Sequence, residues 1–188
     1  MKLNSDKLEL SSDKIFRGPL NLINTNVDIK TDLSKGTHFI NILNLSNKDI
    51  SLKGNILLDL NNDFIHLNTS INSSNIKSLP SIFPKTIMGE NISSWINKSF
   101  IRGKVNEGFI FMKGALSTNP FYHDYSGISY ANLNLNDLNI KYSLEWPSIK
   151  LNNDVVKIKN KNFSFETTNE KIYSSNIKKL RVSVDDMN

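Results

Sequence analysis

The 188-residue sequence has no cysteine, few glycines (8) and few prolines (5). The absence of cysteine excludes disulfide bonds, thiol nucleophiles and metal sites with cysteine ligands. No run of about 20 consecutive apolar residues occurs, so the sequence predicts no transmembrane helix. Met1 to Ser12 also lack the apolar centre of a secretory signal. Disulfide-stapled and thiol-dependent classes, and classes that span a membrane with a helix, are therefore excluded for these residues.

The motifs of common enzymes and metal sites are also missing. The sequence contains no GxSxG, GxGxxG or GxxxxGK[ST], which disfavours the usual hydrolase, dinucleotide-binding and phosphate-loop chemistries. His38, His66 and His123 do not have metal-ligand spacing. Nothing in their spacing pairs the carboxylates of the second half for glycosidase chemistry, namely Asp124, Asp137, Glu145 and Asp154. We expect no enzyme activity, metal or cofactor.

A modest positive charge remains to be explained. The sequence has 23 Lys+Arg against 18 Asp+Glu, a net charge of +5, but its arginines are only Arg17, Arg102 and Arg181. The lysines mostly alternate with apolar positions, as on the solvated face of a sheet with protected edges. Arginines interleaved with aromatic residues, as on nucleic-acid surfaces, do not occur. We therefore expect no nucleic-acid partner; attraction to anionic lipid head groups is the alternative interpretation.

Alternating apolar and polar residues fill most of the sequence and predict strands. The clearest segment is Phe64 to Ile71, in which Ile65, Leu67, Thr69 and Ile71 would share one face. Polar turns such as 47–49, 61–63 and 152–154 separate the strands at intervals of about 8 to 14 residues. The pattern predicts a mostly β chain with about 12 strands in an antiparallel meander.

One segment has helical rather than strand periodicity. Between Pro84 and Gly103, the apolar residues Ile92, Trp95, Ile96 and Phe100 fall on one helical face. Asn91 suits the N-cap and Gly103 suits the position after the helix end. We expect one short α-helix of about three turns.

Three segments follow from these patterns: strands over 1–78, a proline-bounded helical segment over 79–104 and further strands over 105–188. Neither end looks like a finished domain boundary, because both ends consist of strand-like sequence. We expect the chain to be part of a longer, repetitive β-structure whose units need their neighbours.

A set of residues between Leu79 and Phe165 resembles the central region of the YhdP-type, AsmA-like proteins of diderm bacteria. The most specific element is Tyr-x-x-x-Trp-Pro-x-Ile, from Tyr142 to Ile149. Ala115 stands where a proline often follows the glycine of the family pattern. The residues that carry the resemblance are, in order, Leu79, Pro80, Pro84, Trp95, Gly103, Gly114, Pro120, Phe121, Gly127, Tyr142, Trp146, Pro147 and Ile149, followed by strands near 155–158 and 162–165.

The resemblance implies an elongated, curved antiparallel β-sheet that forms an open, taco-like groove and projects through the periplasm. It implies that such a protein conducts glycerophospholipids between the inner and outer membranes without any chemical reaction. A family member carries an N-terminal inner-membrane helix, which this sequence lacks, and is much longer. We therefore expect the anchor in a missing N-terminal part, and further groove segments in the same longer chain.

The alternating strands supply candidate contacts for phospholipid acyl chains. The candidates are Ile56, Leu58, Leu60, Ile65, Leu67, Ile71, Leu138, Ile140, Tyr142, Leu144, Val156, Ile158, Phe163 and Phe165. The alternative for each residue is that it packs against the helix or against its neighbours. We expect Tyr142 and the motif residues Trp95, Trp146 and Pro147 to fix the fold where helix and sheet join.

Two other functions stay open at this stage. The chain could be a structural or assembly scaffold of the envelope that moves no lipid, in which case a second layer would close the apolar face. It could also be a polysaccharide lyase or hydrolase, which would need acidic and basic residues stacked at one point of the sheet. The sequence shows no such cluster.

Overall fold

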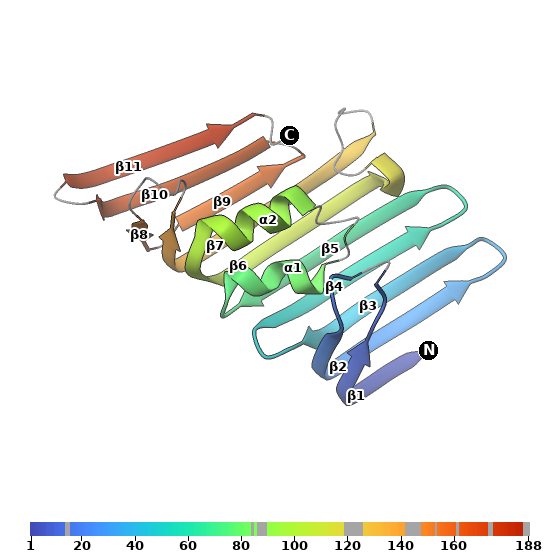
Figure 1. The fold of residues 1–188 in the computed structure, drawn as a ribbon. Helices are drawn as coiled ribbons and strands as arrows, with labels where there is room; N and C mark the ends of the chain where they lie inside the picture. Colours follow the sequence, from blue (N-terminus) through green and yellow to red (C-terminus); the bar gives the residue numbers. More distant parts are fainter. Residues whose placement is uncertain are drawn as a thin grey trace.

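A computed structural model describes residues 1–13, 16–83, 85, 90–118, 126–141, 148–152, 154–160, 162–172 and 175–185. In this described part, eleven antiparallel strands form one open sheet (Figure 1). The strands follow the chain in the order β1-β2-β3-β4-β5-β6-β7-β9-β10-β11, and β8 pairs with β7. The predicted class, an open antiparallel sheet with one short α-helix of about three turns, is confirmed.

The first five strands form a simple meander. Their bounds are β1 Lys2–Leu10, β2 Leu20–Asp32, β3 Thr37–Ser46, β4 Ile50–Asp59 and β5 Phe64–Ser73. The turns after β3 and β4 lie at the polar segments 47–49 and 61–63, as predicted. Asn47 Oδ1 accepts the backbone N–H groups of Asp49 and Ile50, each at 2.8 Å. Asp63 adopts a φ of 47°, which Asp and Asn tolerate better than other side chains.

The second half continues the meander after a helical connection. Its strands are β6 Phe100–Ala115, β7 Gly127–Ile140, β8 Ile149–Leu151, β9 Asp154–Lys159, β10 Asn162–Ile172 and β11 Ser175–Val184. The strands predicted near 155–158 and 162–165 correspond to β9 and β10. β1 and β11 lie at the two edges of the described sheet, with the chain ends at opposite sides (Figure 1).

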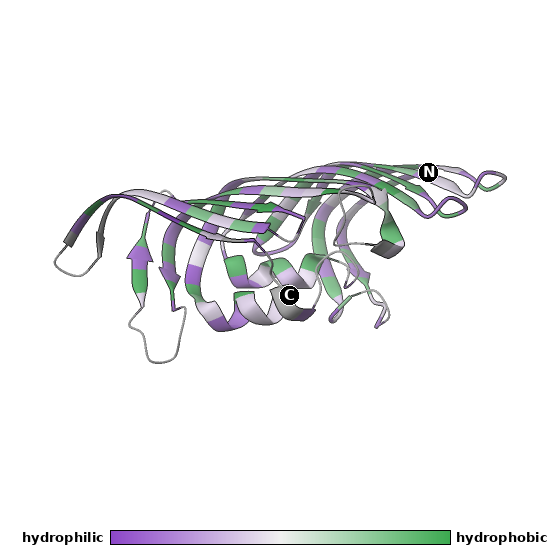
Figure 2. Ribbon diagram, turned by 90° about the horizontal axis from the view of Figure 1, so that it is seen from above, coloured by the Kyte–Doolittle hydropathy of each residue, from purple (hydrophilic) through white to green (hydrophobic). Residues whose placement is uncertain are grey.

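The connection between β5 and β6 contains the helices. It comprises η1 Ile76–Ser78, α1 Leu79–Ile82 and α2 Glu90–Ser99, and another short turn, η2 Leu116–Thr118, follows β6. The sheet curves around the side that carries α1 and α2 (Figure 2). β5 and β6 still pair directly, from Phe64 opposite Ala115 to Ser73 opposite Val105. The helices therefore fold back onto one face of the sheet without separating its strands.

The end of α2 differs from the prediction. Gly103 does not follow the helix end, because α2 ends at Ser99 and Gly103 lies within β6. The chain enters the sheet at Phe100, which is paired with Ile140. A Cβ atom at position 103 would lie 3.0 Å from Leu138 Cδ1 and 3.3 Å from Ile76 Cγ2. The glycine thus permits close packing between η1 and the sheet.

The connection between β1 and β2 holds the helices in place. Arg17 Nη1 donates to the carbonyl oxygen of Pro80 at 3.1 Å, and Arg17 Nη2 lies 3.3 Å from Glu90 Oε1. Lys85 Nζ donates to the carbonyl oxygen of Asp13 at 2.9 Å. Only 17% of the Arg17 side chain is exposed, against 74% of Glu90. Arg17 therefore ties α1 and α2 to a distant part of the chain.

No helix in the described part of the chain is long and apolar enough to span a membrane.

Replacing Gly54 by Ala is expected to lower the free energy of unfolding by about 2–5 kcal/mol. Gly54 has a φ of 151°, and an added Cβ would lie 2.1 Å from the carbonyl oxygen of Asn68 in β5. Backbone strain costs about 1–3 kcal/mol, and overpacking costs a similar amount. Urea unfolding followed by circular dichroism measures the change. Gly18→Ala is the control, because nothing lies within 4 Å of its added Cβ; similar losses for both variants would contradict the prediction.

Arg17→Ala is expected to loosen the helices without unfolding the sheet. Removal of a hydrogen bond and an ion pair of this half-buried guanidinium should cost about 1–2 kcal/mol. Amide hydrogen exchange should become faster over α1 and α2 and stay unchanged in β3 and β4. Lys35→Ala is the matched control, because it removes the exposed pair with Asp32 and should cost less than about 0.5 kcal/mol. Unchanged exchange in α1 and α2 would refute this role for Arg17.

Candidate functional site

The strongest candidate surface is the face of the sheet that carries the helices. Apolar side chains from neighbouring strands meet on it in register, because residues two apart along a strand share a face. One row crosses eight strands and consists of Leu45, Leu52, Ile71, Gly108, Leu133, Val156, Phe165 and Val182. At about 4.8 Å per strand it is about 34 Å long. The same face is therefore apolar from β3 to β11.

Further rows run beside this one. Ile29, Ile40, Ile56, Leu67 and Met112 are paired in turn from β2 to β6. Their strand neighbours, such as Asn55 and Asn68, point to the opposite face. Figure 2 shows the resulting alternation of apolar and polar residues along the strands. The sheet thus has one apolar face and one largely polar face.

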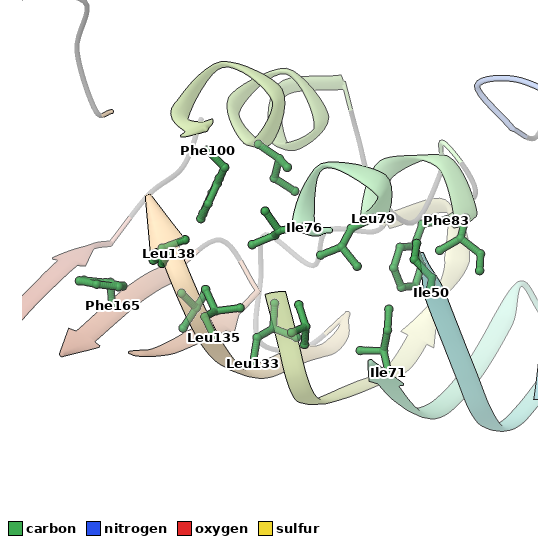
Figure 3. Close-up of a cluster of buried hydrophobic side chains, with 14 of the residues drawn as sticks. Ile50, Ile71, Ile76, Leu79, Phe83, Phe100, Leu133, Leu135, Leu138 and Phe165 are labelled. Carbon is green, nitrogen blue, oxygen red and sulfur yellow. The ribbon is translucent and has the colours of Figure 1, made fainter. Parts of the chain in front are cut away.

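The helices cover one part of the apolar face. Ile76, Leu79, Ile82, Phe83 and Ile96 from the helical connection pack with buried strand residues in one cluster, which we call the helix-covered cluster (Figure 3). Its strand members are Ile50, Leu52, Ile71, Phe100, Val105, Leu133, Leu135, Leu138, Leu151, Val156 and Phe165. Burial of each such side chain contributes about 1.5–3 kcal/mol to folding. This part of the face serves as a conventional protein core.

Seven of the predicted acyl-chain contacts belong to this helix-covered cluster. Ile71, Leu138, Val156 and Phe165 are buried in it, and Ile140, Ile158 and Phe163 pack against it half-buried. For these residues the structure shows the packing that the sequence left as the alternative.

A second cluster lies on the same face; its buried residues differ from those of the first, and half-buried Ile110 packs against both clusters. Ile65, Leu67 and Met112 are buried in it, and Ile56, Leu58, Ile110 and Leu116 pack against them half-buried. These residues come from β4, β5, β6 and η2 rather than from α1 or α2. We call this group the strand cluster. It contains four of the predicted acyl-chain contacts, Ile56, Leu58, Ile65 and Leu67.

Three predicted contacts have other outcomes. Leu60 is not a strand residue, because β4 ends at Asp59; it lies in the turn with 61% of its surface exposed. The Asp59 carboxylate accepts hydrogen bonds from Asn62, which fixes this turn. Tyr142 and Leu144 lie outside the described residues.

Some of the motif residues are described in the structure, and others lie outside the described residues. Trp95 of α2 lies edge-on to Phe100 of β6 and to Phe163 of β10, with ring centroids 5.1 and 5.4 Å apart. It therefore stands where the helix meets the sheet. Gly114 and Gly127 are paired across β6 and β7 and have φ values of 151° and 152°. Pro120, Trp146 and Pro147 lie outside the described residues.

Sequence reasoning missed much of the central apolar face. It did not identify β6, where Phe109 to Met112 form an unbroken hydrophobic run that hides the period of two. It also missed Leu133 and Leu135, although these leucines alternate with Asn132, Asn134 and Asn136. That alternation was a usable signal. The contacts of Arg17 with the helices had no signal, because they join residues far apart in the sequence.

Shifted pKa values occur at exposed carboxylates away from the apolar face. A hydrogen bond from the Ser34 hydroxyl lowers the pKa of Asp32, and one from the Asn62 amide lowers the pKa of Asp59. Lys179, 3.0 Å from Glu166, lowers the pKa of Glu166. At pH values above the ordinary carboxylate pKa, each of these lowered pKa values stabilises the folded state. This stabilisation is lost as the pH falls through the lowered pKa. These groups stabilise turns and the β10–β11 pair.

The histidines and carboxylates considered for metal binding or catalysis do not gather at one site among the described residues. His38 lies by Thr31 at 3.3 Å, and the ring of His66 stacks edge-on against Phe111. Asp137 Oδ1 lies 2.7 Å from Arg102 Nη2, and Asp154 is buried in β9. His123, Asp124 and Glu145 lie outside the described residues. Within the described ranges, no group of three His, Cys, Asp or Glu residues could hold a metal ion.

Comparison with known proteins gives one match. Searches of curated proteins and of solved structures found no match to this chain. The family model described as "YhdP protein" matches residues 1–188, the whole sequence. Such membership indicates an AsmA-like protein of the bacterial envelope, in agreement with the long, one-sided apolar sheet. The chain therefore belongs to the YhdP family.

Proposed function

We propose that this chain is a segment of a periplasmic protein that conducts glycerophospholipids between the inner and outer membranes. The observation that carries the proposal is the continuous apolar face, with rows of aliphatic side chains in register across neighbouring strands. No chemical reaction is part of the proposal. Another part of the same protein would provide the inner-membrane anchor, and further strands would extend the surface.

The physical argument rests on the cost of exposing an acyl chain to water. That cost is about 0.8 kcal/mol per CH₂ group, so a chain of ordinary length meets a barrier above about 10 kcal/mol. A strip of aliphatic side chains lowers the barrier all along its length, because the acyl chain exchanges water for apolar contacts. Head groups need no specific binding and can stay in water.

We propose different tasks for the parts of the face that carry the two clusters. The buried residues that α1 and α2 pack against already have protein contacts, so lipid contact with them would require displacement of a helix. Ile56 and Leu58, which pack against the strand cluster alone, remain half-buried. We therefore place the acyl-chain contacts at the strand cluster.

The helix-covered cluster also supports a second candidate function. A face closed by helices is what an envelope scaffold without lipid transfer would have. The two functions differ in one observable, the presence of bound lipid. Solvent extraction of the purified protein followed by mass spectrometry should find phospholipid if the protein conducts lipid. Folded protein without lipid would favour the scaffold.

A photo-crosslinking amino acid at position 58 is expected to capture phospholipid, and the same group at position 57 is not. Leu57 and Leu58 are adjacent, half-buried leucines of β4 that point to opposite faces. In addition, Leu58→Asp should reduce lipid transfer between donor and acceptor vesicles at least tenfold, because a carboxylate on the path must lose its water. Leu57→Asp is the matched control and should retain transfer.

Circular dichroism of both aspartate variants checks that the sheet is intact. Equal crosslinking at the two positions, or equal loss of transfer in the two variants, would contradict the placement of lipid on this face.

A further inference from the structure

An irregularity of strand pairing interrupts β6 on the polar face of the sheet. The register of β6 shifts between Val105 and Glu107 against β7, and between Ile71 and Ser73 against β5. Asn106 is thus the extra residue of a β-bulge. Gly108, two residues further on, lets Ile71 approach β6 closely, because an added Cβ would lie 2.5 Å from Ile71 Cγ2. Bulges of this kind often redirect side chains next to functional sites.

A hollow of about 520 Å³ opens at this bulge. That volume lies within the range of small-molecule sites. The lining belongs to the polar face, opposite the helices, and comes from β4, β5 and β6: Ser51, Lys53, Ser70, Asn72, Asn106 and Glu107. The hollow is therefore separate from both apolar clusters.

The lining side chains suit a ligand with several hydroxyl groups. Asparagine and serine both donate and accept hydrogen bonds, lysine only donates, and ionised glutamate only accepts. Lys53 and Glu107 are exposed and stand on β4 and β6, the two strands that flank β5. A ligand between them would meet donors on one side and acceptors on the other.

Aromatic rings continue from the hollow along the same face. Phe109 is opposite Ser70 of the hollow and is 40% exposed. Phe111, the next outward residue of β6, is opposite Tyr130 and lies 5.4 Å from the ring of His66. Ring faces offer apolar surface to the C–H side of a flat ligand. Exposed Lys113 and Lys157 nearby favour acidic groups on it.

We propose that this hollow binds one sugar unit of an acidic glycan and that Phe109 and Phe111 support the following units. A pyranose ring combines the two required features, because it has hydroxyl groups at its edge and an apolar C–H face. The envelope offers two sources of such chains, peptidoglycan and the polysaccharide part of lipopolysaccharide. The proposed site lies on the face opposite the lipid contacts, so it stands or falls independently of lipid conduction.

Cosedimentation with isolated peptidoglycan sacculi, and calorimetric titration with the lipid-free polysaccharide released from lipopolysaccharide, test the two sources. The protein should bind in at least one of these arms. Phe109→Ala and Lys53→Ala should each weaken that binding at least fivefold. Phe39→Ala and Lys30→Ala are matched controls on the same face, exposed but outside the hollow, and should stay within twofold.

Phosphatidylglycerol vesicles provide the third arm. Failure of the folded protein to bind either glycan would overturn the proposal, as would equal losses in the hollow variants and their controls. Binding to the vesicles alone would also overturn it, because the lysines and rings would then form a membrane-contacting surface.

Discussion

The structure depends on the separation of apolar and polar side chains between the two faces of a single sheet. A one-layer sheet cannot bury its apolar face by itself, so that face must meet another protein layer, a ligand or water. Here α1, α2 and η1 cover one part of the face, and side chains of the strands and η2 pack on another part. A sandwich of two sheets would close the whole face. The open sheet instead leaves residues such as Ile56 and Leu58 half-buried on this face.

Sequence patterns predicted the sheet well wherever its polar face carries polar residues. Phe64 to Ile71 and the polar turns at 47–49 and 61–63 lie as expected, because alternation and turn chemistry act locally. β6 was missed because Phe109 and Phe111 occupy its polar face and conceal the alternation. Gly103 was misplaced for a related reason: a glycine needed for close packing looks the same in sequence as one that ends a helix.

The sequence predicted which side chains share the apolar face of the sheet, but not which part of that face forms the candidate site. Alternation showed that residues such as Leu58, Leu67 and Phe165 would share one side of the sheet. It could not show that Phe165 would join the helix-covered cluster and that Leu58 would not, because this depends on where distant segments fold back. The tie between Arg17 and the helices is equally non-local.

The insertion of η1, α1 and α2 between two directly paired strands also bears on folding kinetics. β4 and β5 can meet through the short turn at 60–63, whereas pairing of β5 with β6 must close the loop formed by residues 74–99. Loop closure costs more entropy for longer loops and slows non-local pairing. The meander on each side can therefore form first by local hairpins. Joining of the two halves at β5 and β6 then becomes the slow, late step that completes the sheet.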